Sequence, residues 1–356
     1  MYKAVSKVGF RYFFYGLLMT VGGSLIAPFI LRKYFWDFYV QYPEYITLGM
    51  TVLILYVIGF PMMLLLTRKL PKATGEKTQL GFLKYLKYVA ITAGLAFIGL
   101  IIGLVASWIF PKIGGKVSGS ADATGLVSIM FGTNPVLRVL VVGILAPVFE
   151  ELIFRKLLVD RLAPYGETLA IVASGLMFGM FHGNFQQVFF ATLIGGFFAY
   201  VYLRTRRVIY TIFLHMTVNI TTSAITVSLM QWMFGYMGED AMQAALEGDA
   251  AQLKSLLTEL PSEKQILISI ASLALVGWIF LLLGIAVTGI VFIIYSLIKK
   301  QFVIMPVEGE KSKPRQVGVI FISWGMLLFF ATCVVSFLNT YLSIFDKLIS
   351  WLEDIL

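Results

Sequence analysis

The chain has 356 residues, of which 59% are hydrophobic and only 13% are charged. Soluble domains carry about 25% charged residues, so this composition excludes an ordinary soluble domain and indicates an integral membrane protein. The net charge of +9 could suit nucleic acid. Basic residues gather in the cytoplasmic loops of membrane proteins, however, so we expect membrane lipid and no nucleic acid as a partner. The single cysteine, Cys333, excludes an intramolecular disulfide and a cysteine-based metal cluster.

Apolar runs occur at nine places, and most are about 20 residues long, which lets a helix cross ~30 Å of hydrocarbon. They span residues 10–31, 46–66, 88–110, 136–159, 168–182, 185–203, 208–234, 266–297 and 317–338. The sequence therefore predicts an all-α, polytopic membrane bundle of eight or nine transmembrane helices with a polar intramembrane cavity. The first run is longer than the apolar core of a signal peptide, so we expect it to be retained.

Two of these runs depart from a simple crossing. The fifth is short and is separated from the sixth only by Gly183 and Asn184, so the two form either two crossings or a broken, re-entrant pair. We expect Gly183 to end the fifth helix inside the membrane. The eighth run is too long for one crossing, which predicts a tilted helix or an extension beyond the bilayer.

The loop charges predict an orientation. If the N-terminus is cytoplasmic, that side of the membrane collects 20 of the 28 basic residues. The opposite side receives most of the acidic residues, including six carboxylates between residues 235 and 264. The positive-inside rule therefore favours a cytoplasmic N-terminus and an outer C-terminus after nine crossings, and we expect a bacterial cell membrane.

The chain divides into four regions by composition. Residues 1–134 hold about three N-terminal spans, 135–234 form a polar core region, 235–264 form an acidic extramembrane insert, and 265–356 hold C-terminal spans and a tail. Within the insert, Asp240 to Leu257 has the apolar spacing of a surface helix, carried by Met242, Ala245, Leu246, Leu253, Leu256 and Leu257. The tail from Tyr341 to Leu356 has the same amphipathic character.

Ionisable groups inside the apolar runs concentrate in the core region. The two histidines of the chain, His182 and His215, both lie within such runs, and Asn219 follows His215 by four residues, on the same helical face. Adjacent carboxylates, Glu150 and Glu151, lie in the fourth run. An ionisable side chain at that depth costs a few kcal/mol, so a polar site is the expected reason for this set.

The two glutamates are expected to differ. Glu151 and Arg155 are four residues apart and can pair on one face of a helix, whereas Glu150 points about 100° away. Arg155 would neutralise Glu151 and leave Glu150 available for chemistry.

Glutamate, histidine and asparagine together allow hydrolysis by activated water. A glutamate beside an imidazole can deprotonate water, and a second histidine with an amide can donate hydrogen bonds to the oxyanion of a tetrahedral intermediate. Zinc bound by two histidines and a glutamate is the alternative, although the HExxH spacing is absent. A proton-coupled carrier is a further alternative, since buried carboxylates and histidines also serve proton relays. We expect no cofactor.

The order of these motifs resembles the CPBP family, which comprises CAAX-processing endopeptidases and bacteriocin-processing or bacteriocin-immunity proteins, also called the Abi family. The three motifs are E-E-x-x-x-R at Glu150, Glu151 and Arg155, F-x-x-x-H at Phe178 and His182, and H-x-x-x-N at His215 and Asn219. They cover about 70 residues in the middle of the chain.

The resemblance implies an intramembrane protease of the glutamate type. By analogy, Glu150 and His182 activate the water, His215 and Asn219 stabilise the oxyanion, and Glu151, Arg155 and Phe178 support the site. The implied substrate is a membrane-associated peptide or protein, prenylated at its C-terminus in the eukaryotic branch and bacteriocin-like in some bacterial members. A catalytically inactive immunity or regulatory protein of the same fold is the alternative.

The expected helix positions place Glu150 and His215 in the cytoplasmic half of the membrane, ~11–14 Å from that face. His182 joins them only if its helix ends inside the bilayer. The catalytic interpretation requires His182 to lie within about 10 Å of Glu150, so that both side chains can act on one water.

Overall fold

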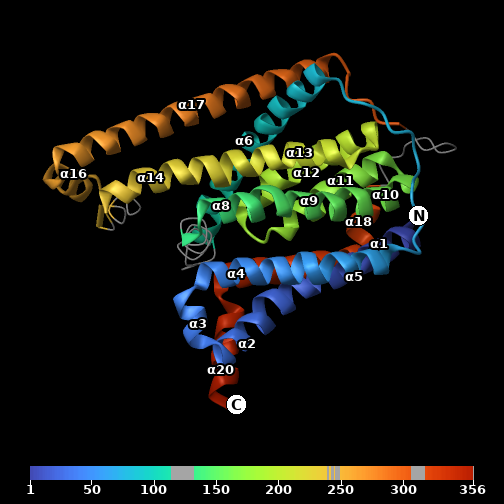
Figure 1. Ribbon diagram of the computed structural model, residues 1–356. Helices are drawn as coiled ribbons and strands as arrows, with labels where there is room; N and C mark the ends of the chain where they lie inside the picture. The colour runs from blue at the N-terminus through green and yellow to red at the C-terminus, as the bar shows by residue number, and fades with distance from the viewer. Residues whose placement is uncertain (114–131, 239, 242–243, 245–248, 306–316, 356) are drawn as a thin grey trace.

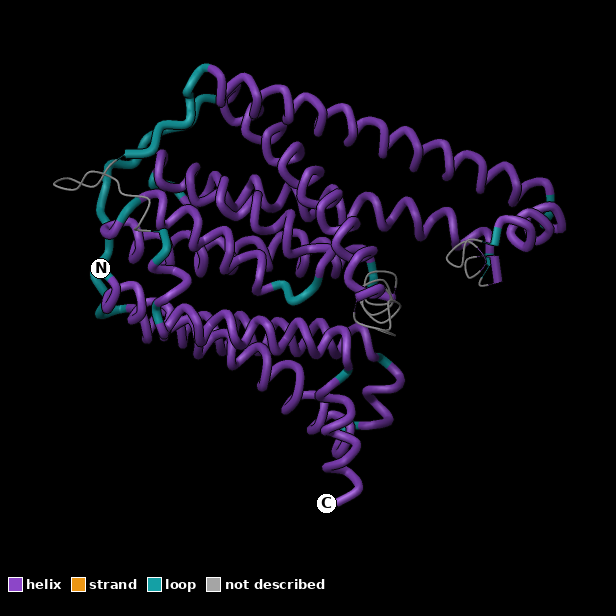
Figure 2. The backbone as a smooth tube through the Cα atoms, turned by 180° about the vertical axis from the view of Figure 1, so that it is seen from behind, coloured by secondary structure: helices purple, strands orange, loops and turns teal. Residues whose placement is uncertain are grey.

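Helices follow the apolar runs because lipid offers no hydrogen-bond partners, so each backbone N–H and C=O must bond within its own segment. The computed structural model describes residues 1–113, 132–238, 240–241, 244, 249–305 and 317–355. These residues form helices and their connections, with no strand among them. The predicted all-α polytopic bundle is thereby confirmed, and Figures 1 and 2 show most helices running roughly side by side.

The N-terminal region forms a hairpin of two long helices, followed by a third long helix. Several of these helices continue through stretches of wider, π-helical hydrogen bonding, here written η; the label η5 below denotes a short 3₁₀ helix instead. The elements are α1 (Tyr2–Leu17), η1 (Leu18–Ile26), α2 (Ala27–Tyr34), α3 (Trp36–Gln41), α4 (Pro43–Thr51), η2 (Val52–Ile58), α5 (Gly59–Thr67) and α6 (Phe82–Ile113).

The core region and the C-terminal region supply the remaining helices. They are α8 (Pro135–Arg138), η3 (Val139–Leu145), α9 (Ala146–Glu151), η4 (Leu152–Val159), α10 (Asp160–Leu162), η5 (Ala163–Tyr165), α11 (Glu167–Phe181), α12 (Phe185–Thr205), α13 (Val208–Asn219), η6 (Ile220–Thr226), α14 (Val227–Met237), α16 (Ala250–Glu259), α17 (Ser262–Ile298), α18 (Val319–Ile322), α19 (Trp324–Leu342) and α20 (Ile344–Ile355).

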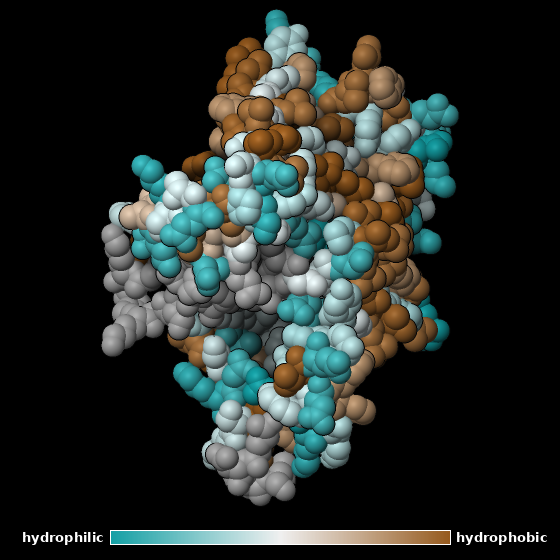
Figure 3. Space-filling model, turned by 60° about the vertical axis from the view of Figure 1, so that its left-hand side comes forward, coloured by the Kyte–Doolittle hydropathy of each residue, from teal (hydrophilic) through white to brown (hydrophobic). Residues whose placement is uncertain are grey.

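Seven helices among the described residues are long and apolar enough to cross a membrane. They are Tyr2–Tyr34, Pro43–Thr67, Phe82–Phe110, Gln187–Thr205, Val208–Met237, Ser262–Ile298 and Trp324–Leu342. In Figure 3 hydrophobic side chains cover the flank of the bundle, and hydrophilic ones gather at the end turned toward the viewer. The chain is a multi-pass membrane protein.

The fourth and fifth apolar runs also form helices but differ from these seven. The helix from α8 to α10 carries Arg138, Glu150, Glu151 and Arg155 among its charged residues, so every 18-residue stretch of it holds at least three charges, whereas the seven have stretches with two at most. Helix α11 has only 15 residues and rises ~22 Å, less than the hydrocarbon thickness. Both exceptions lie in the segment for which the sequence predicts the polar site.

The helices stack in tiers around that segment. Helix α1 packs against α19 and α5, and together they form one side of the bundle. The central tier holds the α8–α10 helix, α11, α12 and α13, with α11 and α12 forming a tightly packed hairpin. Helix α17 lies on the far side, where it packs against α6 and α14. At 37 residues it is over-long, as the sequence predicts.

Three described connections with basic residues lie at one end of the bundle, near the N-terminus in Figure 1: the segment between α5 and α6, the turn between α12 and α13, and the residues that follow α17. They carry Arg68, Lys69, Lys72, Lys77, Arg206, Arg207, Lys299 and Lys300. The segment between α5 and α6 runs along this end, where Ala73 N–H donates to the Asp160 carbonyl (2.6 Å) and Thr78 N–H to that of Thr205 (3.0 Å). The backbone N–H of Met305 reaches the carboxylate of Glu167 at 2.7 Å. The charge asymmetry that predicts the orientation is therefore also a spatial asymmetry.

Three details differ from the sequence prediction. The helix predicted from Asp240 to Leu257 is wrong as a single element, because α16 begins at Ala250 and the Asp249 carboxylate caps it by accepting from Ala251 N–H (3.1 Å) and Gln252 N–H (2.9 Å). Met242, Ala245 and Leu246 lie outside the described residues. The ninth run is broken at Ser323, between α18 and α19.

The third detail is in the amphipathic tail, which begins only after Ser343. Ser343 adopts the left-handed conformation (φ 49°), so Leu342 belongs to α19 and not to the tail helix. Helix α20 then buries Phe345 and Ile349 against η1, as the amphipathic pattern predicts.

The α1–α19 contact depends on glycine. A side chain at Gly325 would overlap the carbonyl oxygen of Ser6, whose hydroxyl accepts the Gly325 N–H at 3.0 Å. We predict that Gly325→Val destabilises the protein by about 1–3 kcal/mol, as overpacking does, and lowers its thermal unfolding midpoint in detergent. Gly284→Val on α17 is the control, because no atom lies within 4 Å of a side chain there. Equal midpoints for the two variants would contradict this packing.

Candidate active site

Glu151 and Arg155 form a buried ion pair at the junction of α9 and η4. Both side chains are fully buried, and Arg155 Nε lies 3.0 Å from Glu151 Oε2. The guanidinium carbon lies 4.5 Å from the ring centroid of Phe178 on α11 and 5.5 Å from that of Phe198 on α12. Aromatic faces attract a desolvated cation, so three helices converge on one charge. The pairing of residues four apart is confirmed.

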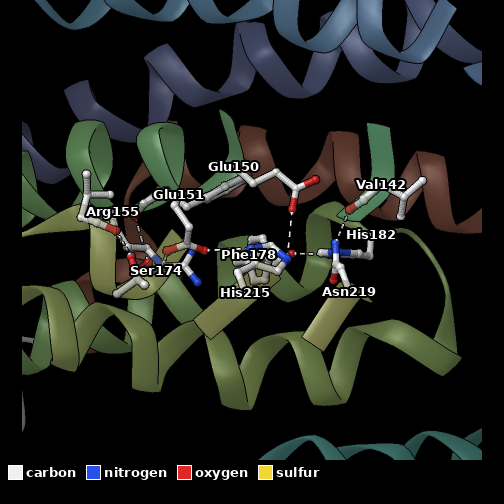
Figure 4. Close-up of polar contacts among 12 residues, drawn as sticks. Val142, Glu150, Glu151, Arg155, Ser174, Phe178, His182, His215 and Asn219 are labelled. Carbon is white, nitrogen blue, oxygen red and sulfur yellow. Dashed lines mark hydrogen bonds and ion pairs between the residues drawn. The ribbon is translucent and has the colours of Figure 1, made fainter. Parts of the chain in front are cut away.

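His215 joins α13 to this pair. Its Nδ1 lies 3.1 Å from Glu151 Oε1, and its side chain is only 4% exposed. Because a carboxylate can only accept hydrogen bonds, Nδ1 carries the proton in this contact. The other ring nitrogen, Nε2, lies 3.8 Å from Glu150 Oε2. His215 therefore bridges the two adjacent carboxylates, as Figure 4 shows.

Glu150 differs from its neighbour in exposure and in partners. Its side chain is 15% exposed, whereas that of Glu151 is fully buried. The hydroxyl of Tyr56, on η2, donates to Glu150 Oε1 at 3.2 Å, and the Tyr56 ring stacks on Phe149 at 5.0 Å. The reachable carboxylate thus contacts an imidazole and a phenol, and the arginine is directed to the other carboxylate.

His182 occupies the first position after α11. The helix ends at Phe181, and Gly183 adopts a left-handed conformation (φ 68°) that a side chain would strain, so the predicted helix end is confirmed. The Nδ1 of His182 lies 2.8 Å from the carbonyl oxygen of Phe178, which must accept, so this nitrogen is protonated and Nε2 is left free. Asn184 then caps α12 by accepting from Gln187 N–H at 2.8 Å.

Phe178 lies between the two histidines. Its ring contacts His182 edge to face at a centroid distance of 4.9 Å and His215 at 5.6 Å. In Figure 4 the side chains of Glu150, His182, His215 and Asn219 are directed toward one region between the helices.

Asn219 sits one turn after His215, at the end of α13. Its Nδ2 donates to the carbonyl oxygen of Val142 at 2.8 Å. An amide nitrogen carries two hydrogens, so one N–H remains available to a ligand. The structure therefore brings together every residue that the three motifs singled out.

Sequence reasoning missed the aromatic hydroxyls that the N-terminal helices contribute. Tyr56 contacts Glu150 directly, and Tyr12 on α1 donates to the carbonyl oxygen of Ile153 at 2.6 Å. The available signal was that a tyrosine hydroxyl inside an apolar run needs a buried partner. Among the described residues, no group of three or more His, Cys, Asp or Glu is arranged to hold a metal ion.

Comparison with known proteins agrees with the motifs. Residues 132–221 match the family model described as "Type II CAAX prenyl endopeptidase Rce1-like". The chain is 26% identical over 204 residues to the Bacillus subtilis (strain 168) protein named "Putative membrane peptidase YdiL", covering 56% of this chain and 79% of that protein. No solved structure gives a significant match. The two matches confirm the resemblance to the CPBP family and support a membrane protease.

The buried ion pair generates a stability prediction. Replacing Arg155 by methionine leaves the Glu151 carboxylate buried beside only one histidine, which costs about 3–5 kcal/mol when one partner of a buried pair is removed. We expect Arg155→Met to lower the thermal unfolding midpoint in detergent strongly. Lys156→Met is the matched control, because the Lys156 side chain is 52% exposed and its ion pair with Asp160 contributes about 0–1 kcal/mol. A midpoint for Arg155→Met equal to that of Lys156→Met would mean that the pair is not needed.

Proposed function

We propose that the protein is an intramembrane peptidase that hydrolyses a peptide bond with water activated by Glu150 and His182. The observation that carries the proposal is the difference in environment between the two adjacent carboxylates. Glu151 is buried and paired with Arg155, while Glu150 is 15% exposed and faces a histidine and a tyrosine. A carboxylate that water can reach, and to which the arginine is not directed, is suited to act as a general base.

The proposed reaction uses His215 with a proton on each ring nitrogen. One N–H is then directed to Glu151 (3.1 Å) and the other toward Glu150 (3.8 Å). Only this form of the ring lets Nε2 donate to a substrate oxygen while Nδ1 donates to Glu151.

In the proposed reaction, water donates one hydrogen bond to Glu150 and the other to the free Nε2 of His182. Glu150 takes a proton, and the hydroxide oxygen bonds to the peptide carbonyl carbon. The carbonyl electron pair moves to oxygen, which accepts hydrogen bonds from His215 Nε2–H and from the remaining N–H of Asn219. When the carbon–nitrogen bond breaks, protonated Glu150 gives its proton to the leaving amine. No covalent enzyme intermediate forms.

The substrate that this site favours is a peptide or protein held at the membrane. The Rce1-like match suggests a lipid-modified C-terminus of the CAAX type as the first class to test. A bacteriocin-like peptide without a lipid is the second class. We further propose that the basic end of the bundle faces the cytoplasm, by the positive-inside rule, and that the host membrane is a bacterial cell membrane.

Glu150→Gln tests the general base. We expect peptide cleavage to fall by about 10²–10⁴, the contribution of general acid–base catalysis, because an amide cannot take a proton from water. Purified protein in liposomes is assayed with fluorogenic CAAX-type peptides, with and without a prenyl group, and with an unmodified bacteriocin-like peptide.

Glu263→Gln, at the exposed start of α17, is the control and should cleave normally. Full cleavage by Glu150→Gln would sink the peptidase mechanism. A different result would favour an immunity or regulatory role: the parent protein cleaves none of the peptides, and the parent and Glu150→Gln bind a membrane partner equally well.

Chelation separates the water mechanism from a zinc mechanism. The Nε2 atoms of His182 and His215 both remain unbonded to the backbone, so zinc is a chemical alternative on these residues. We expect 1,10-phenanthroline to leave cleavage unchanged after prolonged incubation. Loss of cleavage that added zinc restores would assign the water activation to a metal.

A further inference from the structure

Two buried tyrosines reach the candidate site from helices that lie outside the Rce1-like segment 132–221. Tyr56, on η2, is 4% exposed and donates its hydroxyl to Glu150 Oε1 at 3.2 Å. Its ring stacks on Phe149 at 5.0 Å with an interplanar angle of 9°, which fixes the direction of the hydroxyl. Phe149, which precedes Glu150 in the sequence, thus holds the ring of Tyr56, whose hydroxyl contacts Glu150.

Tyr15, on α1, is fully buried, and its hydroxyl has no hydrogen-bond partner among the described residues. Its ring stacks on Phe181, the residue that directly precedes His182. Burying a hydroxyl without a partner costs free energy, and native structures rarely retain such a group unless a water or a ligand satisfies it. The orphaned hydroxyl therefore belongs to a ring packed against the helix end that presents His182.

The position of the Tyr15 ring is closely determined. One face stacks on Phe181 at 5.1 Å with an interplanar angle of 5°. The other side meets Gly59 of α5, where an added side-chain carbon would lie 2.7 Å from Tyr15 Cε2. One turn earlier, Tyr12 anchors α1 to the carbonyl oxygen of Ile153. A ring held this way keeps its hydroxyl in one place without bonding it.

We propose that Tyr15 is a catalytic residue whose hydroxyl donates a hydrogen bond to the water that Glu150 deprotonates, and that Tyr56 is a positioning residue for Glu150. This inference rests on the proposed function. The water would then give its two hydrogens to Glu150 and His182 and accept one from Tyr15, which leaves one lone pair to bond the carbonyl carbon. Three polar partners match what a buried water ordinarily makes.

The test measures kcat and KM of Tyr15→Phe and Tyr56→Phe with the peptide that the parent protein cleaves. Both variants keep the stacked ring and lose only the hydroxyl. We expect kcat to fall by about tenfold to a hundredfold with KM nearly unchanged, because the lost hydrogen bond acts on water and not on the peptide. Tyr12→Phe is the control: it loses a buried hydrogen bond to the backbone, and should lower the unfolding midpoint but leave kcat unchanged.

Gly59→Ala provides a second variant that keeps the hydroxyl and moves the ring, and it should also lower kcat. In the Glu150→Gln background, Tyr15→Phe should add little, since residues that serve one step are not additive. Additive losses, or a full kcat for Tyr15→Phe, would overturn the tyrosine proposal and leave the peptidase standing if Glu150→Gln is inactive. Full cleavage by Glu150→Gln would instead remove the proposed function, and this inference with it.

Discussion

A carboxylate buried among apolar helices must have a cation beside it, and the rest of this structure depends on how that requirement is met at Glu151. Arg155 is on the same helix, so the pair forms without any tertiary contact. The guanidinium then needs a surface on which to lie, and Phe178 and Phe198 of the α11–α12 hairpin supply it. The second oxygen of Glu151 receives His215 and thereby fixes α13. A single charge compensation consequently sets the mutual position of four helices.

The same compensation explains why Glu150 is chemically distinct although it is the next residue. Adjacent helical positions point in different directions, so Arg155 reaches one carboxylate and cannot reach the other. Glu150 is instead surrounded by an imidazole, a phenol and aromatic rings. The guanidinium that pairs with Glu151 is directed away from Glu150. The two adjacent carboxylates thus occupy different faces of the helix, and their exposure and partners differ accordingly.

Most of the fold and the set of residues that form the candidate site can be predicted from the sequence, because the membrane setting restricts both. Backbone groups force helices onto apolar runs, and each ionisable group within a run is conspicuous, as Glu150, His182 and His215 are. Pairwise contacts are less accessible. The ion-pair contact with the Glu150 carboxylate comes from His215 and not from His182. Which histidine makes it depends on how the helices are rotated and not on the spacing of residues in the sequence. Tyr56 is one of 17 tyrosines, and nothing in its spacing distinguishes it from the others.

The short helix α11 has a consequence for what holds its end in place. With 15 residues it reaches ~22 Å, and beyond it Asn184 caps the next helix after the left-handed Gly183. Phe181, Gly183 and Asn184 are all buried, so protein surrounds this end of the helix. Irregular backbone at membrane depth is tolerated where protein encloses it. The neighbours of α11, among them α12, η4 and α19, therefore take over the role that a further helical turn would have in fixing His182.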